Sequence, residues 1–441
     1  MVQIHPANID LAAALAEAEE QYRAANPKSL AQHREACAAM PGGNTRASIH
    51  VDPFPLTIAR GEGARLWDLD GHEYADFLSE FTAGIFGHSH PAIHRAIKEA
   101  LADGLNFGAH TAAEARFAAA ICARFPSIEL VRFTNSGTEA NLMAVSAARA
   151  ITGQPKILVF GGGYHGGVFY FRGHRSAINA PFDYLIGRYN DLDAVEELVR
   201  PHRDQLAAIL IEPMQGSTGC IPAERAFLAG LRALADATGA LLIFDEVMTS
   251  RLAPGGLQEV LGILPDLTTL GKYLGGGMSF GAFGGRADIM ERFDPRRPDA
   301  LQHAGTFNNN VLTMAAGHIG LTEIYTPECA RALNQWGDAL RERLNRIAQR
   351  HGLAMQFTGR GSMMSVHMTD RPIRSEDDVL RGNSALRDLF WFDLVASGIW
   401  FAKRGMFALS IALDDAAADK LAHAVEEFAQ TRAPLFAAIG R

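Results

Sequence analysis

The sequence predicts an α/β protein whose larger part is a mostly parallel β-sheet covered by helices, with a smaller α+β part beside it. Five short, almost continuously apolar runs occur between residues 130 and 270, and such runs are typical of strands buried on both faces. Helical segments lie between several of these runs, as connections between parallel strands require. After about residue 315 long amphipathic stretches replace this alternation, which indicates a second unit.

The N-terminal part begins with a predicted helix that Asp10 can cap and that Asn26-Pro27 ends. Its apolar face consists of Leu11, Ala14, Leu15, Ala18 and Tyr22. Residues 41–75 are expected to be irregular to β-like, with a hairpin turn at Asp70-Gly71. We assign residues 1–75 to a small domain that the end of the chain completes.

The middle of the chain, residues 76–315, is expected to form the large domain. Its five strand candidates are Leu130–Phe133, Lys156–Phe160, Ala207–Ile211, Ala240–Phe244 and Leu267–Leu270. Between the first two strands, Glu139–Ile151 carries an alanine-rich stripe at helical spacing.

Residues 316–441 are expected to form the rest of the small domain. Three amphipathic helices are predicted there, over Glu328–Arg350, Asp377–Ala396 and Ala416–Ala429. They enclose two strand-like pieces, FTGRGSMMSVHM and GMFALSIAL.

Composition excludes several classes of function. The net charge of −8, from 41 basic and 49 acidic residues, leaves no electrostatic footprint for nucleic acid. No run of 18 apolar residues suggests a membrane span, and the first 21 residues lack the pattern of a signal peptide. The four cysteines are far apart and no Cys/His cluster has zinc-ligand spacing, so reduced thiols and no metal are expected. A cytoplasmic globular protein is the expectation.

Ligands of open α/β sheets bind beyond the carboxyl ends of the strands, so the residues that follow each strand are informative. After the first strand comes TNSGTEAN, where Ser136 and Thr138 suit the start of a helix whose free amides could hold a phosphate. An ordinary capped helix is the simpler interpretation of this motif alone.

The second strand is followed by GGGYHGG, which matches the dinucleotide fingerprint G-x-G-x-x-G. No helical pattern follows it, however, so a nicotinamide site is disfavoured. We expect instead that the glycines let Tyr164 and His165 project toward a ligand, where an aromatic side chain could stack on a planar ring.

Two further strands end in charged residues. Asp245 follows LLIF and could hold a proton on a heteroaromatic nitrogen, or could bond backbone amides. The chain has no Walker A motif, so Asp245-Glu246 does not indicate a triphosphatase. Lys272 follows LTTL in glycine-rich, apolar surroundings, where loss of water would lower its pKa and leave a nucleophilic amine. A lysine that reaches the surface is the alternative.

A polar turn, His303–Asn310, offers another phosphate contact through its hydroxyl and amides. The combination of an anion site, a stacking aromatic, a carboxylate for a ring nitrogen and a Schiff-base lysine matches what pyridoxal phosphate needs.

These motifs resemble those of class III aminotransferases, which are fold-type-I pyridoxal-phosphate transferases. FTNSGTEAN, LLIFDEVMTSR, LTTLGKYLGGGMSFGAFGGR and AGTFNNN carry the resemblance in order and spacing, and it extends from PGGNTR to the last helices. The chain is most similar to the aromatic β-amino acid (β-phenylalanine) aminotransferases, with glutamate-1-semialdehyde aminomutases as cousins.

The resemblance implies a role for each matching residue. Lys272 would bind pyridoxal 5′-phosphate through a Schiff base, Asp245 would pair with the pyridine nitrogen, and Tyr164 and Val247 would cover the two ring faces. Ser136, Gly137 and Thr138 would hold the phosphate, Thr306 would reach the phosphate of the neighbouring subunit of a homodimer, and Glu212 would support the site.

Two arginines, Arg46 and Arg404, would bind the carboxylates of the substrates, one on each side of the cofactor. Planar guanidinium groups suit carboxylates better than lysine does. The aminomutase pattern has a Ser-Gly-Asn segment in place of Phe307-Asn308-Asn309 and no counterpart of Arg404, which favours a true aminotransferase.

The resulting hypothesis is a two-half-reaction transfer from a β-amino acid, such as 3-amino-3-phenylpropanoate, to 2-oxoglutarate or pyruvate. The alternatives left open are a 2,1-aminomutase or a racemase at the same site, and a non-catalytic or NAD-binding α/β protein.

Overall fold

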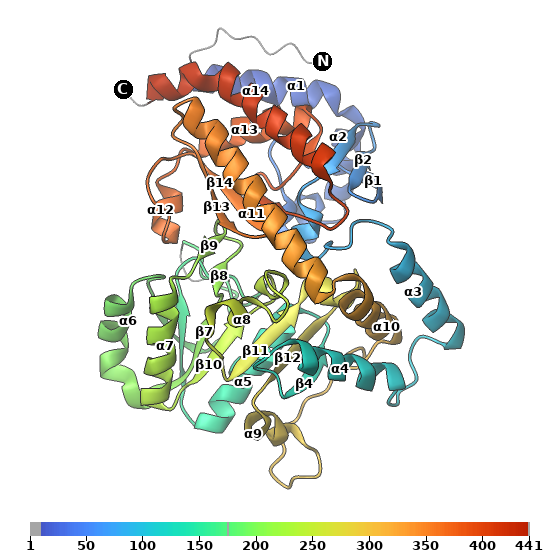
Figure 1. The fold of residues 1–441 in the computed structure, drawn as a ribbon, viewed down its shortest axis with the longest axis vertical. Helices are drawn as coiled ribbons and strands as arrows, with labels where there is room; N and C mark the ends of the chain where they lie inside the picture. Colours follow the sequence, from blue (N-terminus) through green and yellow to red (C-terminus); the bar gives the residue numbers. More distant parts are fainter. Residues whose placement is uncertain (1–9, 174–175, 440–441) are drawn as a thin grey trace.

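The computed structural model describes residues 10–173 and 176–439, and Figure 1 shows its arrangement. The expectation that no signal peptide begins the chain falls partly on residues 1–9, which lie outside the described residues. The middle of the chain builds a large sheet with its helices, and the N- and C-terminal segments lie together at one end of this sheet (Figure 1). Within the described residues, no helix has the length and apolarity that crossing a membrane requires.

The large sheet has seven strands in the order β4-β12-β11-β10-β7-β5-β6. Its strands are β4 Leu130–Thr134, β5 Lys156–Phe160, β6 Asp183–Gly187, β7 Leu206–Ile211, β10 Leu241–Asp245, β11 Leu267–Gly271 and β12 Gly281–Gly285. Only β12 runs against its neighbours, so the predicted mostly parallel sheet is confirmed, with the five predicted strands in place.

Two strands of this sheet escaped the sequence analysis, β6 and β12. The sequence of β12 is GAFGG, which carries almost no apolar pattern. Its glycines serve close packing, since a Cβ at Gly281 would lie 2.1 Å from the Ser136 carbonyl oxygen and one at Gly284 2.6 Å from that of Leu130. β6 is an edge strand whose side chains are only partly buried, and its short apolar run gave too weak a signal.

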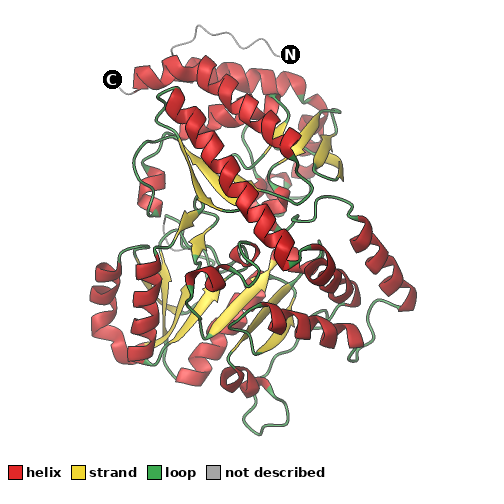
Figure 2. Cartoon of the chain, in the orientation of Figure 1, coloured by secondary structure: helices red, strands yellow, loops and turns green. Residues whose placement is uncertain are grey.

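Helices cover both faces of the large sheet (Figure 2). The helices of this part of the chain are α3 Pro91–Asp103, which packs on α10 rather than on the sheet, α4 Ala112–Arg124, α5 Gly137–Thr152, α6 Leu192–Val199, α7 Arg225–Thr238, α8 Leu257–Leu261, α9 Ala287–Met290 and α10 Val311–Ile319. Alternate strand residues serve the two faces: Leu158 and Ile209 pack with α7, whereas Ile157 and Leu210 pack with α5. The alanine stripe of α5 lets this helix lie close to the sheet.

The N-terminal segment contains α1 Leu11–Ala25, α2 Pro27–Cys37 and the strands β1 Ile58–Glu62, β2 Arg65–Asp68 and β3 Glu73–Asp76. The Asp10 side chain caps α1 as predicted, and β2 and β3 form a hairpin around Asp70-Gly71. The break at Asn26 is real, but Pro27 then starts a second helix, a position that proline tolerates because no partner is needed for its missing N–H.

The C-terminal segment contains α11 Pro327–Arg350, α12 Glu376–Leu380, α13 Ser384–Ala396 and α14 Asp415–Ile439. Its strands are β13 Gln356–Arg360, β14 Met363–His367, β15 Ile399–Trp400 and β16 Met406–Ala408, and two short strands, β8 Met214–Gln215 and β9 Ile221–Pro222, lie near it. The single helix expected over Asp377–Ala396 is two helices, because Asn383 caps a new start after Gly382.

The ends of the chain share one sheet. β15 pairs in parallel with β3, and α1 packs on α13. These pairings support one small domain assembled from residues 1–75 and 316–441, and we propose these boundaries and a large domain over residues 76–315.

Candidate active site

Lys272 lies directly after β11, at the carboxyl edge of the large sheet, and begins a short 3₁₀ turn. Its φ of 57° is in the left-handed region, which costs a non-glycine residue about 1 kcal/mol. Burial lowers the pKa of Lys272 to about 8, and the positive charges of Arg404 and Arg46 act in the same direction. In the part of the chain that the structure describes, no side chain forms an ion pair with this amine. Lys272 is therefore a desolvated amine rather than a surface lysine.

Asp245 ends the neighbouring strand β10, and hydrogen bonds hold both of its carboxylate oxygens. Oδ2 accepts from Asn141 Nδ2 at 2.8 Å and lies 2.8 Å from His165 Nδ1, while Oδ1 accepts from the Val247 amide at 3.0 Å. Because an ionised carboxylate only accepts, His165 Nδ1 carries the hydrogen. Asn141 is itself held by Thr269, whose hydroxyl donates to Asn141 Oδ1 at 2.7 Å. The Asp245 carboxylate is thus fixed in position by three polar neighbours.

The turn after β5 presents two neighbouring side chains in opposite directions. Tyr164 is 38% exposed, pairs with Tyr170 across a short β-bridge, and its ring lies 5.9 Å from that of Tyr170. His165 is only 2% exposed and turns toward Asp245. The expectation that both side chains face a ligand was therefore wrong for His165, because a buried carboxylate needs donors and this ring supplies one.

Glu212 follows β7 at the same edge of the sheet. Its Oε1 accepts from the Tyr164 amide at 2.9 Å and its Oε2 from the Gly216 amide at 3.0 Å. Burial raises the pKa of Glu212 to about 7, although the charge of nearby His165 and the two amides oppose this shift. Glu212 therefore fixes the backbone that presents the Tyr164 ring.

The start of α5 forms an anion site next to these residues. The Ser136 hydroxyl caps the helix by accepting from the Glu139 amide at 3.2 Å, which leaves its own hydrogen free to donate. The first amides of the helix, at Gly137 and Thr138, have no partner within it. A Cβ at Gly137 would lie 2.8 Å from Val247 Cγ2, so glycine is what lets Val247 pack over this turn.

Thr306 lies exposed in a turn beside the same helix start. Asn308, two residues later, accepts from Asn135 Nδ2 at 2.9 Å. The turn is thus anchored near the anion site of its own chain, and the expected reach of Thr306 to a neighbouring subunit stays a prediction.

Arg46 and Arg404 come from opposite ends of the chain and meet at one ring. The guanidinium carbon of Arg404 lies 4.7 Å from the centroid of Phe81, and that of Arg46 lies 5.8 Å from it. Burial lowers the pKa of Arg404 to about 10, with the positive charge of Arg172 as the next cause. Within the described residues, Arg404 Nε is buried without an acceptor, and Nη2 forms a hydrogen bond to Met406 Sδ at 3.6 Å. Neither arginine forms an ion pair with any described carboxylate.

Sequence reasoning missed Asn141 and Phe81. Asn141 had a readable signal, because it is a polar residue on the buried alanine face of α5 and is 1% exposed. Phe81 had no such signal, since no pattern in the sequence LSEFTAG predicts the backbone turn that positions it.

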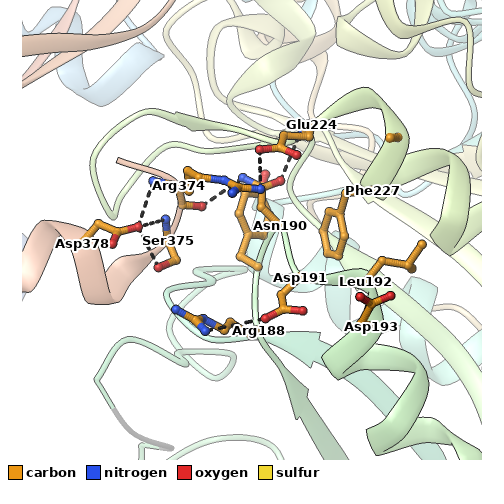
Figure 3. A pocket seen from close by; sticks show the side chains of 12 residues that line it. Arg188, Asn190, Asp191, Leu192, Asp193, Glu224, Phe227, Arg374, Ser375 and Asp378 are labelled. Carbon is orange, nitrogen blue, oxygen red and sulfur yellow. Dashed lines mark hydrogen bonds and ion pairs between the residues drawn. The ribbon is translucent and has the colours of Figure 1, made fainter. Parts of the chain in front are cut away.

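A surface pocket of about 580 Å³ lies apart from these residues, between the loops that precede α6 and α7 and the segment that leads into α12 (Figure 3). Its charged side chains satisfy one another: Arg374 pairs with Glu224 at 2.7 Å, and Arg188 with Asp191 at 3.6 Å. The pocket shares no residue with the cluster at the strand ends. Within residues 10–173 and 176–439, no group of three His, Cys, Asp or Glu side chains has metal-ligand geometry.

The cluster at the strand ends thus combines a nucleophilic amine, a fixed carboxylate, an aromatic ring and a helix start that can hold a phosphate. The chain belongs to the class-III aminotransferases, whose family model matches residues 47–427. It therefore transfers an amino group from an amino donor to a keto acid acceptor, and its cofactor is pyridoxal 5′-phosphate.

Three relatives place the chain within this family. It is 54% identical to a beta-phenylalanine transaminase of Variovorax paradoxus over 415 residues, which are 94% of this chain and 95% of the relative. The crystal structure of a beta-phenylalanine aminotransferase from Variovorax paradoxus superposes with a TM-score of 0.94 at 52% identity, over 96% of this chain and 98% of that chain. A glutamate-1-semialdehyde 2,1-aminomutase of Rhodopirellula baltica is 40% identical over 79% of this chain and 83% of its own length. The fold is that of the fold-type-I pyridoxal-phosphate transferases.

The residues present fit this cofactor. The amine of Lys272 is desolvated, the Asp245 carboxylate is held in position by hydrogen bonds and could face a ring nitrogen, and the amides at the start of α5 are free for a phosphate. The buried Arg404 Nε, which lacks an acceptor, additionally marks a place for an anion.

Proposed function

We propose that this enzyme transfers the amino group of an aromatic β-amino acid, such as 3-amino-3-phenylpropanoate, to a 2-oxo acid, either 2-oxoglutarate or pyruvate. The observation that carries the proposal is the pair Arg46 and Arg404, two guanidinium groups without carboxylate partners, whose charges act on Lys272. The 54% identity to a beta-phenylalanine transaminase supports the choice of donor.

The first set of roles concerns cofactor binding. Pyridoxal 5′-phosphate supplies a carbonyl carbon that captures amines and a ring that withdraws electrons from the carbon bearing the nitrogen. Lys272 would hold it covalently, and Asp245 would keep a proton on the ring nitrogen. The amides of Gly137 and Thr138 and the hydroxyl of Ser136 would bind the phosphate, where the positive end of the helix dipole favours an anion.

Side chains on both sides would fix the plane of the ring. Tyr164 would cover one face, with its backbone held by Glu212, and Val247 would pack against the other. Val247 is well suited because the hydrogen bond from its amide to Asp245 ties the packing surface to the carboxylate.

Lys272 would also move the proton. A general base works best when its pKa is near the operating pH, and the pKa of about 8 leaves part of this amine neutral at physiological pH. When the incoming substrate amine frees it from the cofactor, the Lys272 amine would take the proton from the substrate carbon that bears the nitrogen. It would then deliver this proton to the carbon on the other side of the same nitrogen. Asp245, fixed by Asn141 and His165, would hold the ring proton throughout.

Each arginine would bind a substrate in one of the two half-reactions. Arg46 would bind the carboxylate of the β-amino acid, and Arg404 the α-carboxylate of the 2-oxo acid. A β-amino acid carries its carboxylate one methylene further from the reacting carbon than an α-keto acid does, so two separate guanidinium groups suit the two substrates.

We further propose a homodimer with shared active sites, in which Thr306 binds the phosphate of the neighbouring subunit, and a cytoplasmic location. Large apolar side chains are exposed beside the Thr306 turn, with Phe107 at 53% and Phe307 at 57%. The segment around Phe107 contacts the turn that contains Thr306 and Phe307, because Asn309 Nδ2 donates to the Ala109 carbonyl oxygen at 3.3 Å. All four cysteines are free thiols, as is usual in a reducing compartment.

A panel of donors against acceptors tests the function. We expect keto-acid-dependent amino transfer from 3-amino-3-phenylpropanoate, with Arg46→Ala raising KM mainly for the β-amino acid and Arg404→Ala mainly for the 2-oxo acid. Turnover without any added acceptor would replace the transaminase with an aminomutase or a racemase.

A further inference from the structure

Phe81 lies between the two candidate carboxylate-binding residues and is presented by an unusual piece of backbone. Four consecutive non-glycine residues, Ser79–Thr82, have positive φ values of 44°, 50°, 55° and 83°. Each left-handed residue of this kind costs about 1–2 kcal/mol, and runs of them are avoided. The Ser79 and Thr82 hydroxyls are buried and have no hydrogen-bond partner within the described residues. This turn is therefore not built for stability.

Surrounding groups hold the strained turn in place at both ends. Asp76 Oδ1 accepts from the amides of Leu78 and Ser79 at 2.9 and 3.0 Å, and Asp76 Oδ2 lies 2.9 Å from His88 Nε2. At the other end, the fully buried Arg251 donates to the Thr82 carbonyl oxygen at 3.3 Å. The backbone is thus over-determined by contacts outside the turn, which is how strain persists at functional positions.

The ring that this turn presents contacts both guanidinium groups. Their distances to its centroid, 4.7 Å for Arg404 and 5.8 Å for Arg46, are within the range of cation–π attraction. Two like charges repel each other, and no described carboxylate pairs with either. The electron-rich ring is therefore a contact that the half-buried Arg404 and the exposed Arg46 share before an acid binds.

We propose that Phe81 is a specificity-determining residue, because its ring fixes the positions of both arginines and so controls recognition of the amino donor and of the amino acceptor together. This inference rests on the proposed function, in which Arg46 and Arg404 bind the two acids. The strained turn is the means by which the chain places this one ring at the meeting point of its N- and C-terminal segments.

The alternative is that Phe81 only fills the core, where it packs in a cluster that includes Met406 and Ala402. The two roles separate by chemistry. A leucine keeps most of the apolar volume but removes the ring, whereas a tyrosine keeps the ring.

Binding of unreactive acids to the cofactor-loaded enzyme, measured by calorimetry, tests the proposal. The probes are 3-phenylpropanoate, which has the carboxylate and the phenyl ring of the proposed donor, and glutarate, which has the carboxylates of 2-oxoglutarate. We expect Phe81→Leu to weaken binding of both acids about three- to tenfold, as loss of a partly desolvated cation–π contact predicts. Phe81→Tyr should bind both acids nearly as the unchanged enzyme does.

Matched variants separate this result from a packing defect. Arg46→Ala should weaken only 3-phenylpropanoate and Arg404→Ala only glutarate, whereas Phe81→Leu affects both. Glu80→Gln, in the same turn but with an exposed side chain, should leave both affinities and the melting temperature unchanged.

Three results would overturn the proposal: unchanged affinities in Phe81→Leu, equal losses in Phe81→Leu and Phe81→Tyr, or a loss for one acid only. If Phe81→Leu does not fold, Phe81→Met serves as the ring-free variant. The probes cannot react, so their binding can be measured even if the enzyme turns over no β-amino acid. Such a lack of turnover would contradict the proposed function, and the binding data would still test the role of Phe81. An unchanged enzyme that binds neither acid would end both.

Discussion

The two sides of the active site differ in how their charges are satisfied. On the side built by the strand ends of the large sheet, three donors hold Asp245 and two backbone amides hold Glu212. On the side built by the N- and C-terminal segments, Arg46 and Arg404 lack carboxylate partners among the described residues, which also offer no acceptor to Arg404 Nε. The unpartnered Arg404 Nε is buried, which is costly, whereas Arg46 is exposed to water, so we expect an acid to complete this side at Arg404 above all.

This difference separates residues that are expected to act on every substrate alike from residues that are expected to distinguish one substrate from another. Changes on the strand-end side should lower kcat with all substrates alike, and changes on the arginine side should act on KM and depend on which acid is used. The predictions that follow test this division.

The largest effect is expected for Lys272→Ala, which under the proposed assignment would remove both the covalent attachment of the cofactor and the proton-transferring amine. We expect kcat to fall by about 10⁴-fold with every donor and acceptor. Borohydride reduction followed by peptide mass analysis should fix the cofactor on Lys272 in the unchanged protein and nowhere in the variant. Lys420→Ala, at another lysine whose pKa burial lowers, is the matched control and should behave like the unchanged enzyme. Residual labelling at a different lysine in Lys272→Ala would contradict the assignment.

The depressed pKa of Lys272 predicts how cofactor loading depends on pH. Only the neutral amine can attack a carbonyl, and burial lowers its pKa from the usual value near 10.5 to about 8. The rate at which cofactor-free protein takes up pyridoxal phosphate should therefore rise about tenfold per pH unit well below pH 8, by about fiftyfold from pH 6 to 8, and by no more than about twofold above pH 8. Stopped-flow absorbance measures this rate. A rate that continues to rise up to pH 10 would show a lysine with an ordinary pKa.

The strand-end side was largely readable from the sequence, and the reason is local. Lys272, Asp245 and Glu212 each follow a buried apolar strand directly, so the strand signal and the chemical signal are neighbours in the chain. What holds these side chains was less readable. Asn141 and His165 reach Asp245 from a helix and a turn far away in sequence, and no local pattern shows such a pairing.

Arg46 and Arg404 were each predicted from the sequence as carboxylate-binding residues, but their meeting at one ring was not. The pairing of β3 with β15, two very short strands from opposite ends of the chain, brings Arg404 near Phe81, and Arg46 reaches the same ring from the N-terminal segment. Phe81 depends on a left-handed turn of ordinary residues, which is fixed by Asp76 and Arg251 rather than by glycine. Such backbone is dictated by tertiary contacts, and sequence patterns do not report it.

The next largest effect is expected on the arginine side. In the proposed roles, Arg46→Ala and Arg404→Ala would each remove a charge-assisted contact to a carboxylate, and we expect about a thirtyfold rise in KM for the acid concerned. kcat at saturation should change little, because Lys272 and Asp245 stay in place. Arg60→Ala is the control, since the guanidinium carbon of Arg60 also lies over an aromatic ring, 3.5 Å from the centroid of Trp67, but Arg60 already pairs with a carboxylate, that of Glu62 at 3.2 Å. Equal losses for donor and acceptor in either variant would break the division between the two sides.

The smallest effect tests the hydrogen bonds behind Asp245. His165→Ala removes one of the three donors to this carboxylate, and we expect kcat to fall about tenfold with every substrate while KM stays nearly constant. His165→Gln can still donate and should recover part of the loss, as a positioning role requires. His72→Ala breaks a similar contact outside the site, where His72 Nδ1 lies 2.9 Å from Asp68, and should leave kcat unchanged. A loss in His165→Ala that depended on the acceptor would mean that the strand-end side also selects substrates. The hydrogen bonds of the Asp245 carboxylate would then change with the acid that is bound at the arginines. Its three donors would couple Asp245 to the substrate instead of holding it in one position.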